Sequence, residues 1–393
     1  MSRALTLDPT RTGRDAEGLK SNLRRLVVGQ DEAIEQIVSV YQTHLAGMNP
    51  PGRPVGSFLF LGPTGSGKTR IVEATTEALV RNPRAVIKID CGEFQHSHEI
   101  AKLIGSPPGY LGHRETHALL SQEALNEHHT EQVKLSFVLF DEVEKASDAL
   151  WNLLLGILDK ATLTLGDNRR VDFSNCMVFL TGNLGAHEMS ALMNPRLGFG
   201  AMAQAKAMAD GTPDDGKLEG KLQRPAVEAA RRKFTHEFMN RLDKIVTFRP
   251  LGTEELKKIV DIELNMVQQR VLGSSGEKAF IFKVTDSGKK HLLTEGTDMK
   301  YGARHLKRAI ERLVVQPISN LIATDQVRAG DSLPIDYPDG GMAMTFVREA
   351  EGLSHRYMAE ITGNPWIPPI TAAASATAFG PPEPRPARSS RKA

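Results

Sequence analysis

One glycine-rich stretch, residues 62–69, constrains this chain more than any other part of its sequence. It reads Gly62-Pro63-Thr64-Gly65-Ser66-Gly67-Lys68-Thr69 and fits the pattern G-x-x-x-x-G-K-[ST] at every position. An apolar run at 57–61 precedes it, and apolar residues at helical spacing follow it. A strand, a glycine loop and a helix N-terminus together turn backbone N–H groups toward an anion. We therefore predict that residues 62–69 bind the phosphates of a nucleoside triphosphate, with ATP as the expected ligand.

The ends of three apolar runs carry the other groups that such a site needs. After the first run, Lys68 is expected to reach the β- and γ-phosphates, and the Thr69 hydroxyl to bind Mg²⁺. The run at 136–140 ends in Asp141 and Glu142, which we expect to hold the Mg²⁺ shell and to orient the attacking water, respectively. The run at 177–180 leads to Asn183, which could hydrogen-bond the same water or the γ-phosphate. Alone, such an asparagine is more often a turn residue.

Composition excludes several other classes of protein. The 49 lysines and arginines nearly balance the 47 acidic residues, for a formal net charge of +2, which gives no electrostatic case for nucleic acid or an anionic membrane as the main partner. Residues 1–10 lack the apolar core of a secretory signal, and no apolar run approaches the roughly 20 residues that span a bilayer. The 2 cysteines, Cys91 and Cys176, cannot form a disulfide framework or a four-cysteine zinc site. We expect a cytoplasmic protein.

The order of apolar and polar segments predicts two folded domains. We expect a flexible leader over 1–20, a large ATPase domain over 21–250, a small C-terminal α/β domain over 251–348 and a disordered tail rich in Pro, Ala, Ser and Arg over 349–393. The large domain should be α/β with a parallel sheet, because its apolar runs lack alternation and helical segments lie between them. The runs are 58–61, 85–89, 137–140, 177–180 and 245–248.

Two further expectations concern segments outside those runs. Residues 200–220, rich in Ala, Met, Gly and Asp, should form a mobile insertion. In the small domain we expect a helix at 253–271, a strand at 280–284, two further helices and a terminal strand near 343–347.

Placed in order, these pieces resemble the Clp unfoldases of the AAA+ class, above all the second ATPase module of the double-ring members ClpA, ClpB and ClpC. The likeness runs from Val27 to about Val347. The following signatures carry it: Val28-Gly29-Gln30, Gly109-Tyr110-Leu111-Gly112, Asp141-Glu142-Val143-Glu144-Lys145-Ala146, Leu158-Asp159, Val171-Asp172-Phe173, Glu237-Phe238-Met239-Asn240-Arg241 and Tyr301-Gly302-Ala303-Arg304.

This resemblance implies a fold and several residue roles. The fold is that of an AAA+ P-loop NTPase, with a parallel-sheet large domain and a small α/β domain. Val27 and Val28 resemble the segment that packs on adenine, and Asn183 resembles sensor 1. Arg241 resembles the arginine finger that projects into the neighbouring subunit's ATP site, and Arg304 resembles sensor 2. A guanidinium in either place would stabilise charge developing on the phosphoryl oxygens.

The resemblance also implies two loops that contact other proteins. Tyr110 and Leu111, flanked by glycines, look like the pore loop with which a homo-hexameric ring grips a polypeptide; the alternative is a plain turn, since Pro107-Pro108-Gly109 is turn chemistry. Residues 162–170 resemble a second pore loop or hairpin. Leu197, Gly198 and Phe199 resemble the loop by which ClpA, ClpC and ClpX dock on the ClpP peptidase, a loop that ClpB-type proteins lack. Alternatively, Leu197 and Phe199 pack on their own domain.

Together these features imply an ATP-dependent protein unfoldase that is not itself a peptidase. We expect the ATP-binding subunit of a Clp-type protease, which threads unfolded or tagged proteins through a hexamer pore toward a ClpP-like peptidase. One phosphate loop and no folded N-terminal substrate domain are expected, so an adaptor or the basic tail would capture substrates. One alternative is a chaperone that remodels or disaggregates proteins without a peptidase. Another is an AAA+ loader acting on DNA, against which Tyr110 and the balanced charge both count.

Overall fold

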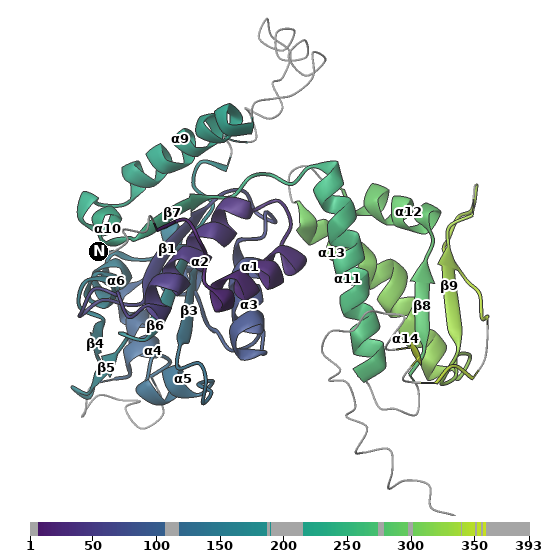
Figure 1. The fold of residues 1–393 in the computed structure, drawn as a ribbon, viewed down its shortest axis with the longest axis horizontal. Helices are drawn as coiled ribbons and strands as arrows, with labels where there is room; N and C mark the ends of the chain where they lie inside the picture. Colours follow the sequence, from purple (N-terminus) through teal and green to yellow (C-terminus); the bar gives the residue numbers. More distant parts are fainter. Residues whose placement is uncertain are drawn as a thin grey trace, which may run out of the picture. The chain divides into compact units, whose positions relative to one another are not determined.

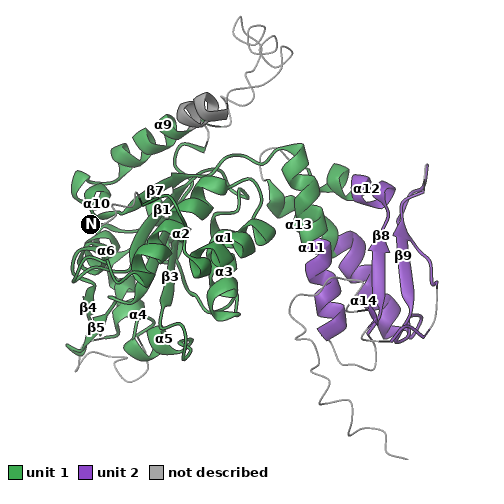
Figure 2. Ribbon diagram, in the orientation of Figure 1, with its two compact units in different colours: residues 1–262, 292–311 green, residues 263–291, 312–393 purple. Residues whose placement is uncertain are grey.

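The computed structural model describes residues 7–106, 118–186, 189, 215–273, 279–297, 302–338, 340–349, 352–354 and 357–358, and for 215–222 it describes the backbone alone. The chain divides into two compact units (Figure 2). Unit 1 comprises Met1–Ile262 with Leu292–Glu311, and unit 2 comprises Glu263–His291 with Arg312–Ala393.

The described part of unit 1 is built around a parallel sheet (Figure 1). Its five strands have the order β2-β3-β6-β1-β7. The strands are β1 (Gly56–Leu61), β2 (Ile87–Asp90), β3 (Ser136–Asp141), β6 (Cys176–Gly182) and β7 (Lys244–Thr247). Each apolar run named from the sequence overlaps one of these strands. The expected α/β fold with a parallel sheet is therefore confirmed.

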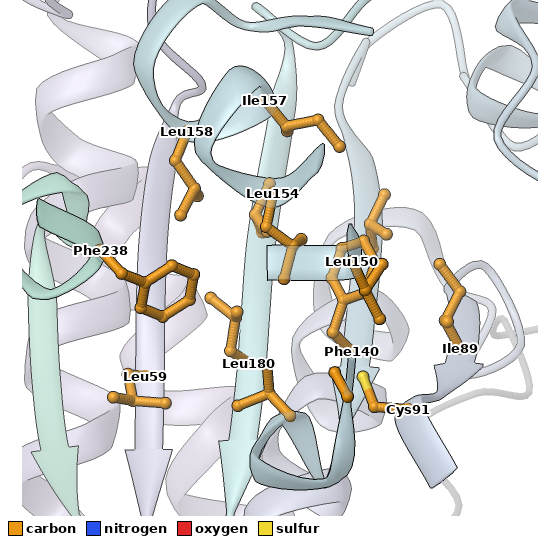
Figure 3. Close-up of a cluster of buried hydrophobic side chains, with 14 of the residues drawn as sticks. Leu59, Ile89, Cys91, Phe140, Leu150, Leu154, Ile157, Leu158, Leu180 and Phe238 are labelled. Carbon is orange, nitrogen blue, oxygen red and sulfur yellow. The ribbon is translucent and has the colours of Figure 1, made fainter. Parts of the chain in front are cut away.

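Helices cover both faces of this sheet, which is why its strands are apolar at consecutive positions. In β1, Leu59 and Leu61 belong to one buried cluster, and Phe58 and Phe60 belong to another. The first cluster includes residues of α6 (Asp148–Lys160) and α10 (His236–Arg241), shown in Figure 3. The second includes residues of α1 (Arg14–Leu26), α2 (Asp31–Leu45) and α3 (Lys68–Val80).

Shorter elements connect the strands of unit 1. They are the 3-10 helices η1 (Cys91–Glu93), η2 (Ser97–Ile100) and η3 (Val143–Lys145), and the helices α4 (Ala101–Ile104) and α5 (Gln122–Asn126). The antiparallel pair β4 (Thr162–Thr164) and β5 (Arg170–Asp172) shows that 162–170 folds as a hairpin. Helix α9 (Asp215–Lys233) begins inside the stretch 200–220, so a helix occupies the last residues of the expected mobile insertion.

Unit 2 contains a separate sheet with the order β10-β9-β8. Its strands are β8 (Ile281–Val284), β9 (Ser332–Asp336) and β10 (Thr345–Phe346). Strand β9 differs from the sequence-based expectation, which had no strand there: Pro334 lies in its middle and cannot donate a ladder hydrogen bond. Its carbonyl oxygen still accepts a hydrogen bond from the Val347 N–H at 3.0 Å.

The remaining helices lie in the last third of the chain. Two of them, α11 (Thr253–Gly273) and α12 (Asp286–Gly296), contribute residues to both units. Helix α13 (Ala303–Ile310) belongs to unit 1, whereas the π-helix η4 (Glu311–Val315) lies almost wholly in unit 2 and α14 (Gln316–Ala323) lies within it. Within the described residues, no helix is long and apolar enough to cross a membrane.

A few described residues at the start of the predicted tail, 349–393, make contacts within unit 2. Glu349 pairs with Ser332 in an isolated β-bridge, and the Leu353 N–H donates to the Gly330 carbonyl at 3.0 Å. Met358 is 2% exposed and packs with Leu272 and Ala279. The apolar side chains of Leu353 and Met358 therefore cover apolar surface of unit 2.

Candidate functional site

The carboxyl ends of β1, β3 and β6 lie next to each other in unit 1, and Asn183 connects the groups that follow them. Its side-chain oxygen accepts hydrogen bonds from Lys68 Nζ at 3.0 Å and from Thr64 Oγ1 at 3.4 Å. Its side-chain nitrogen donates to Glu142 Oε1 at 3.1 Å. The structure thus brings three predicted site segments together at one edge of the sheet, where ligands of parallel α/β folds bind.

Close packing and unusual backbone angles fix the glycine loop. Gly62 has a φ of 151°, and a Cβ there would lie 2.6 Å from the Phe248 carbonyl oxygen, so only glycine fits this position without a shift. Gly67 precedes α3 with a φ of 102°, and a Cβ there would meet no atom within 4 Å. The space beside Gly67 is therefore open, directly before the N-terminus of α3, where backbone N–H groups and the helix dipole favour an anion.

Lys68 is a buried cation at the start of α3. It is 7% exposed, and its ammonium group donates to the carbonyl oxygens of Gly62 at 2.7 Å and Pro63 at 2.9 Å. Burial lowers the pKa of Lys68 to about 8, although the charges of Asp141, Glu144 and Glu142 oppose that shift. A buried ammonium beside an open helix N-terminus fits a phosphate group, which would supply the negative charge that this place favours.

The two carboxylates after β3 have different partners. Thr181 Oγ1 donates a hydrogen bond to Asp141 and accepts one from the Glu142 N–H at 3.1 Å. Glu142 has a φ of 56°, a left-handed conformation that is uncommon outside glycine. Lys145 forms an ion pair with Glu142 Oε2, and this hydrogen bond, with a smaller one from Asn183, lowers the pKa of the Glu142 carboxyl. At neutral pH the Glu142 side chain is therefore a carboxylate, the form that can accept a proton from water.

The oxygen groups beside the loop suit a hard divalent cation. Thr69 is the second residue of α3, directly after Lys68, and the Asp141 carboxylate ends β3. A hydroxyl and a carboxylate are the kinds of ligand that Mg²⁺ prefers. Both residues flank the anion cradle, so the residues present fit a Mg²⁺ ion bound together with phosphate.

Three residues whose roles sequence patterns alone do not reveal also support this site. Thr181 binds both carboxylate residues, as described above. Gln30 is 4% exposed, and its side-chain nitrogen donates to the carbonyl oxygens of Ser66 at 3.0 Å and Arg249 at 2.9 Å, so it ties the glycine loop to the segment after β7. Glu144 Oε1 accepts the Asn183 N–H at 2.9 Å, and Glu144 Oε2 is buried without a hydrogen-bond partner. All three lie inside quoted signatures or strands, but spacing alone does not reveal their partners.

The other predicted ATP-site residues are placed as follows. Val27 is 6% exposed and belongs to the buried cluster of α1 and α2, whereas Val28 is half-buried. Arg304 lies on α13, and its positive charge contributes to lowering the pKa of both Lys68 and Glu142. Just before it, the Ala303 N–H donates to the Gly65 carbonyl oxygen at 3.3 Å.

Arg241 is paired away from the group around Asn183. It ends α10 and forms an ion pair with Asp159 near the end of α6. The predicted loop residues Tyr110 and Leu111, and Leu197, Gly198 and Phe199, lie outside the residues that the structure describes.

Two family models match consecutive parts of the chain. Residues 53–245 match the AAA domain (Cdc48 subfamily), and residues 251–335 match the C-terminal, D2-small domain, of ClpB protein. The first match contains the glycine loop, Asp141, Glu142, Asn183 and Arg241, and the second contains Arg304.

Curated relatives and solved structures agree with these matches. The chain is 36% identical over 332 residues to the chaperone protein ClpB of Helicobacter hepaticus, which covers 84% of the chain and 35% of that protein. It is 35% identical over 323 residues to the ATP-dependent Clp protease ATP-binding subunit ClpC of Staphylococcus aureus, covering 81% of the chain and 36% of that protein. The chain thus spans about a third of the length of these relatives. An S. cerevisiae Hsp104:casein complex in an extended conformation is similar with a TM-score of 0.68 and 26% identity, over 86% of this chain and 53% of that one.

Proposed function

We propose that this chain, which belongs to the Clp ATPase family of AAA+ proteins, couples ATP hydrolysis to the movement of polypeptide through a ring of its own copies. Membership of this family supports an ATPase rather than a peptidase. The observation that carries the proposal is the convergence of Lys68, Glu142 and Asn183 at the open N-terminus of α3.

Each of the described site residues would have a separate role in ATP hydrolysis. Lys68 would bind the β- and γ-phosphates, and the backbone of 62–69 would surround them. Mg²⁺, held by Thr69 and Asp141, would neutralise charge on the phosphate oxygens. Glu142 would accept a proton from the attacking water, and Asn183, which already contacts both Lys68 and Glu142, would orient that water. Val27 and Val28 would pack on the adenine.

Two arginines would complete the site from different subunits. Arg304 would bind the phosphates of its own chain, as sensor 2 of the Clp family does; its contribution to lowering the pKa of Lys68 and of Glu142 supports a place near them. Arg241 is paired with Asp159 instead. By analogy with the arginine finger of the Clp family, it would serve the ATP bound by a neighbouring copy. A guanidinium at that place stabilises charge that develops on the transferred phosphoryl group. Rings of six copies are the assembly that we propose, by analogy with the Clp family.

We expect Tyr110→Ala to lower the rate at which a folded reporter protein is unfolded by about tenfold, because alanine removes most of the apolar area that grips the chain. ATP turnover should stay within about twofold, since residue 110 belongs to neither of the sequence segments, 62–69 and 141–142, that supply the predicted phosphate and water contacts. Loss of reporter fluorescence and phosphate release, measured in the same sample, check both expectations. Tyr110→Phe, which keeps the ring, is the matched control and should unfold the reporter normally. Unfolding by Tyr110→Ala at the normal rate would reject the pore role.

The second part of the proposal is that a ClpP-like peptidase binds this chain and degrades the polypeptide that it unfolds. Relatives described as a ClpC protease subunit and as ClpB chaperones are similarly close in identity, so both a ClpP-like partner and a peptidase-independent chaperone are supported. We favour the peptidase partner because Leu197, Gly198 and Phe199 supply two apolar anchors suited to a hydrophobic cleft. An adaptor would deliver unfolded or tagged substrates.

Deletion of residues 197–199 should separate these two functions. We expect degradation of a tagged substrate in the presence of a ClpP-like peptidase to fall at least about tenfold, because two buried anchors carry most of the energy of such a contact. Unfolding without the peptidase should not change. Peptide release and reporter fluorescence measure the two activities, with replacement of 197–199 by Gly-Gly-Gly as a length-matched variant. Undiminished degradation in both variants would place docking elsewhere or favour the chaperone alternative.

A further inference from the structure

The guanidinium of Arg241 is held by an acidic residue of its own chain. Its Nη1 atom forms an ion pair with Asp159 Oδ1. Its Nη2 atom lies 3.9 Å from Glu237 Oε1, one helical turn earlier in α10. The side chains of Arg241 and Asp159 are 33% and 31% exposed, whereas that of Glu237 is 65% exposed. Asp159 is therefore the main partner, and Glu237 is a distant and solvated one.

Asp159 lies at the C-terminal end of α6, a position that disfavours a negative charge. It is the next-to-last residue of α6, and the dipole of a helix places partial negative charge at that end. Arg241, the last residue of α10, occupies a favourable position for a positive charge. The ends of two helices thus meet through opposite charges, and Arg241 offsets the unfavourable position of Asp159.

Helix α6 is a rigid support for that carboxylate. Leu150, Leu154, Ile157 and Leu158 are each at most 1% exposed and insert from one face of α6 into the core (Figure 3). At the other end of the helix from Asp159, the Trp151 indole donates to the Val143 carbonyl oxygen at 3.0 Å, directly after Glu142. A helix packed in this way fixes the position of the backbone from which the Asp159 side chain extends.

The backbone of α10 is fixed as well, so the freedom that remains belongs to the Arg241 side chain. The Thr235 hydroxyl caps α10 by accepting the Phe238 N–H at 3.2 Å, and Phe238 lies in the core with Leu158 (Figure 3). A guanidinium has several N–H groups on different sides. The ion pair with Asp159 uses one of them, which leaves others to bind phosphate oxygens.

We propose that Asp159 is a positioning residue for Arg241, which it holds in the place where the guanidinium meets the ATP bound by a neighbouring copy. This inference rests on the proposed function, in which Arg241 acts across the subunit interface. A long side chain held in advance loses less freedom when it binds phosphate, and a misplaced group loses much of its effect on rate. The pair also links the nucleotide site of one subunit, through α6 and Trp151, to the arginine that it presents to the next.

Mixed assemblies test the two steps separately. Arg241→Ala subunits keep every residue of their own site but lack the arginine, and Glu142→Gln subunits have a silent site but an intact Arg241. Each alone should hydrolyse ATP slowly, and their mixture should recover activity if Arg241 acts across the interface. In these mixtures the Glu142→Gln subunit is the donor, because it supplies Arg241 to its neighbour. In the second mixture, the donor carries both Glu142→Gln and Asp159→Ala. We expect its recovered kcat to be about tenfold lower, because the donor's arginine is no longer positioned.

The KM for ATP should stay unchanged between these mixtures, since ATP turns over in subunits whose own site residues are intact. A donor that combines Glu142→Gln with Glu237→Ala is the matched control and should recover the full rate. A donor with Asp159→Asn, which has the same shape without the charge, should give an intermediate rate. Light scattering in the presence of ATP must show the same assembly size for all donors, which separates loss of positioning from loss of folding.

The possible results have distinct meanings. If the first mixture recovers no activity, Arg241 does not act across the interface, and both that part of the proposed function and the role of Asp159 are rejected. If the first mixture recovers and the Asp159→Ala donor performs equally well, the role of Asp159 alone is rejected. A donor that performs better without Asp159 would also overturn the proposal, because Asp159 would then restrain Arg241 instead of presenting it.

Discussion

Glu142→Gln is expected to lower steady-state ATP turnover by about a thousandfold, the effect of removing a general base. The amide keeps the shape of the side chain and can still accept the hydrogen bond from Asn183, but it cannot accept a proton from water. ATP binding should remain, because Lys68 and the backbone of 62–69 are unchanged. Phosphate release at saturating ATP measures turnover, and binding of a fluorescent ATP analogue measures affinity.

An exposed glutamate near the same edge of the sheet provides the control for this substitution. Glu93 lies in η1, directly after β2, and Glu93→Gln removes one negative charge from an exposed side chain. Its turnover should stay within about twofold of the unmodified protein. The same samples should show stable assemblies of the Glu142→Gln protein with ATP by light scattering. Turnover by Glu142→Gln close to that of Glu93→Gln would remove Glu142 from the role of base.

The sequence predicted that Lys68, Glu142 and Asn183 lie together, because a short motif determines much of the local structure around Lys68. The pattern of 62–69 requires glycines where the loop has positive φ angles or meets Phe248, and it places Lys68 at the first turn of a helix. Asp141 and Asn183 follow apolar runs, and the ends of neighbouring parallel strands must meet at one edge of the sheet. The expected parallel sheet and the order of the motifs were therefore enough to predict that Lys68, Glu142 and Asn183 lie close together.

Contacts between segments far apart in the sequence could not be predicted in this way. Gln30 reaches Arg249, and Asp159 reaches Arg241, through the packing of whole helices on the sheet. No local spacing specifies such partners, since each side chain alone would suit a solvated surface. Strand β9 shows a similar limit: Pro334 weakens its local signal, yet β8 and β10 pair with it on both sides. Tertiary contacts decided these cases, and local preference did not.

Lys68→Met is expected to abolish the stabilisation that ATP gives to the fold. In the unmodified protein, ATP at a hundredfold excess over its Kd should add about 2.7 kcal/mol to the free energy of unfolding. For a domain of this kind, that is a rise in Tm of roughly 5–10 °C. Methionine has a similar shape but no charge, so we expect ATP affinity to fall at least about a hundredfold and the rise to disappear. Differential scanning calorimetry with and without ATP measures the ATP-dependent rise in Tm.

The same substitution should not weaken the protein in the absence of ATP, and this second expectation separates lost binding from lost folding. The pKa of Lys68 is lowered to about 8, chiefly by burial, so folding disfavours its charged form at neutral pH. Removing that charge removes this cost, which offsets the loss of hydrogen bonds to Gly62, Pro63 and Asn183. Lys88→Met, which removes an exposed lysine on β2, is the control and should keep the full ATP-dependent rise. A rise of normal size in Lys68→Met would mean that ATP does not bind at the N-terminus of α3.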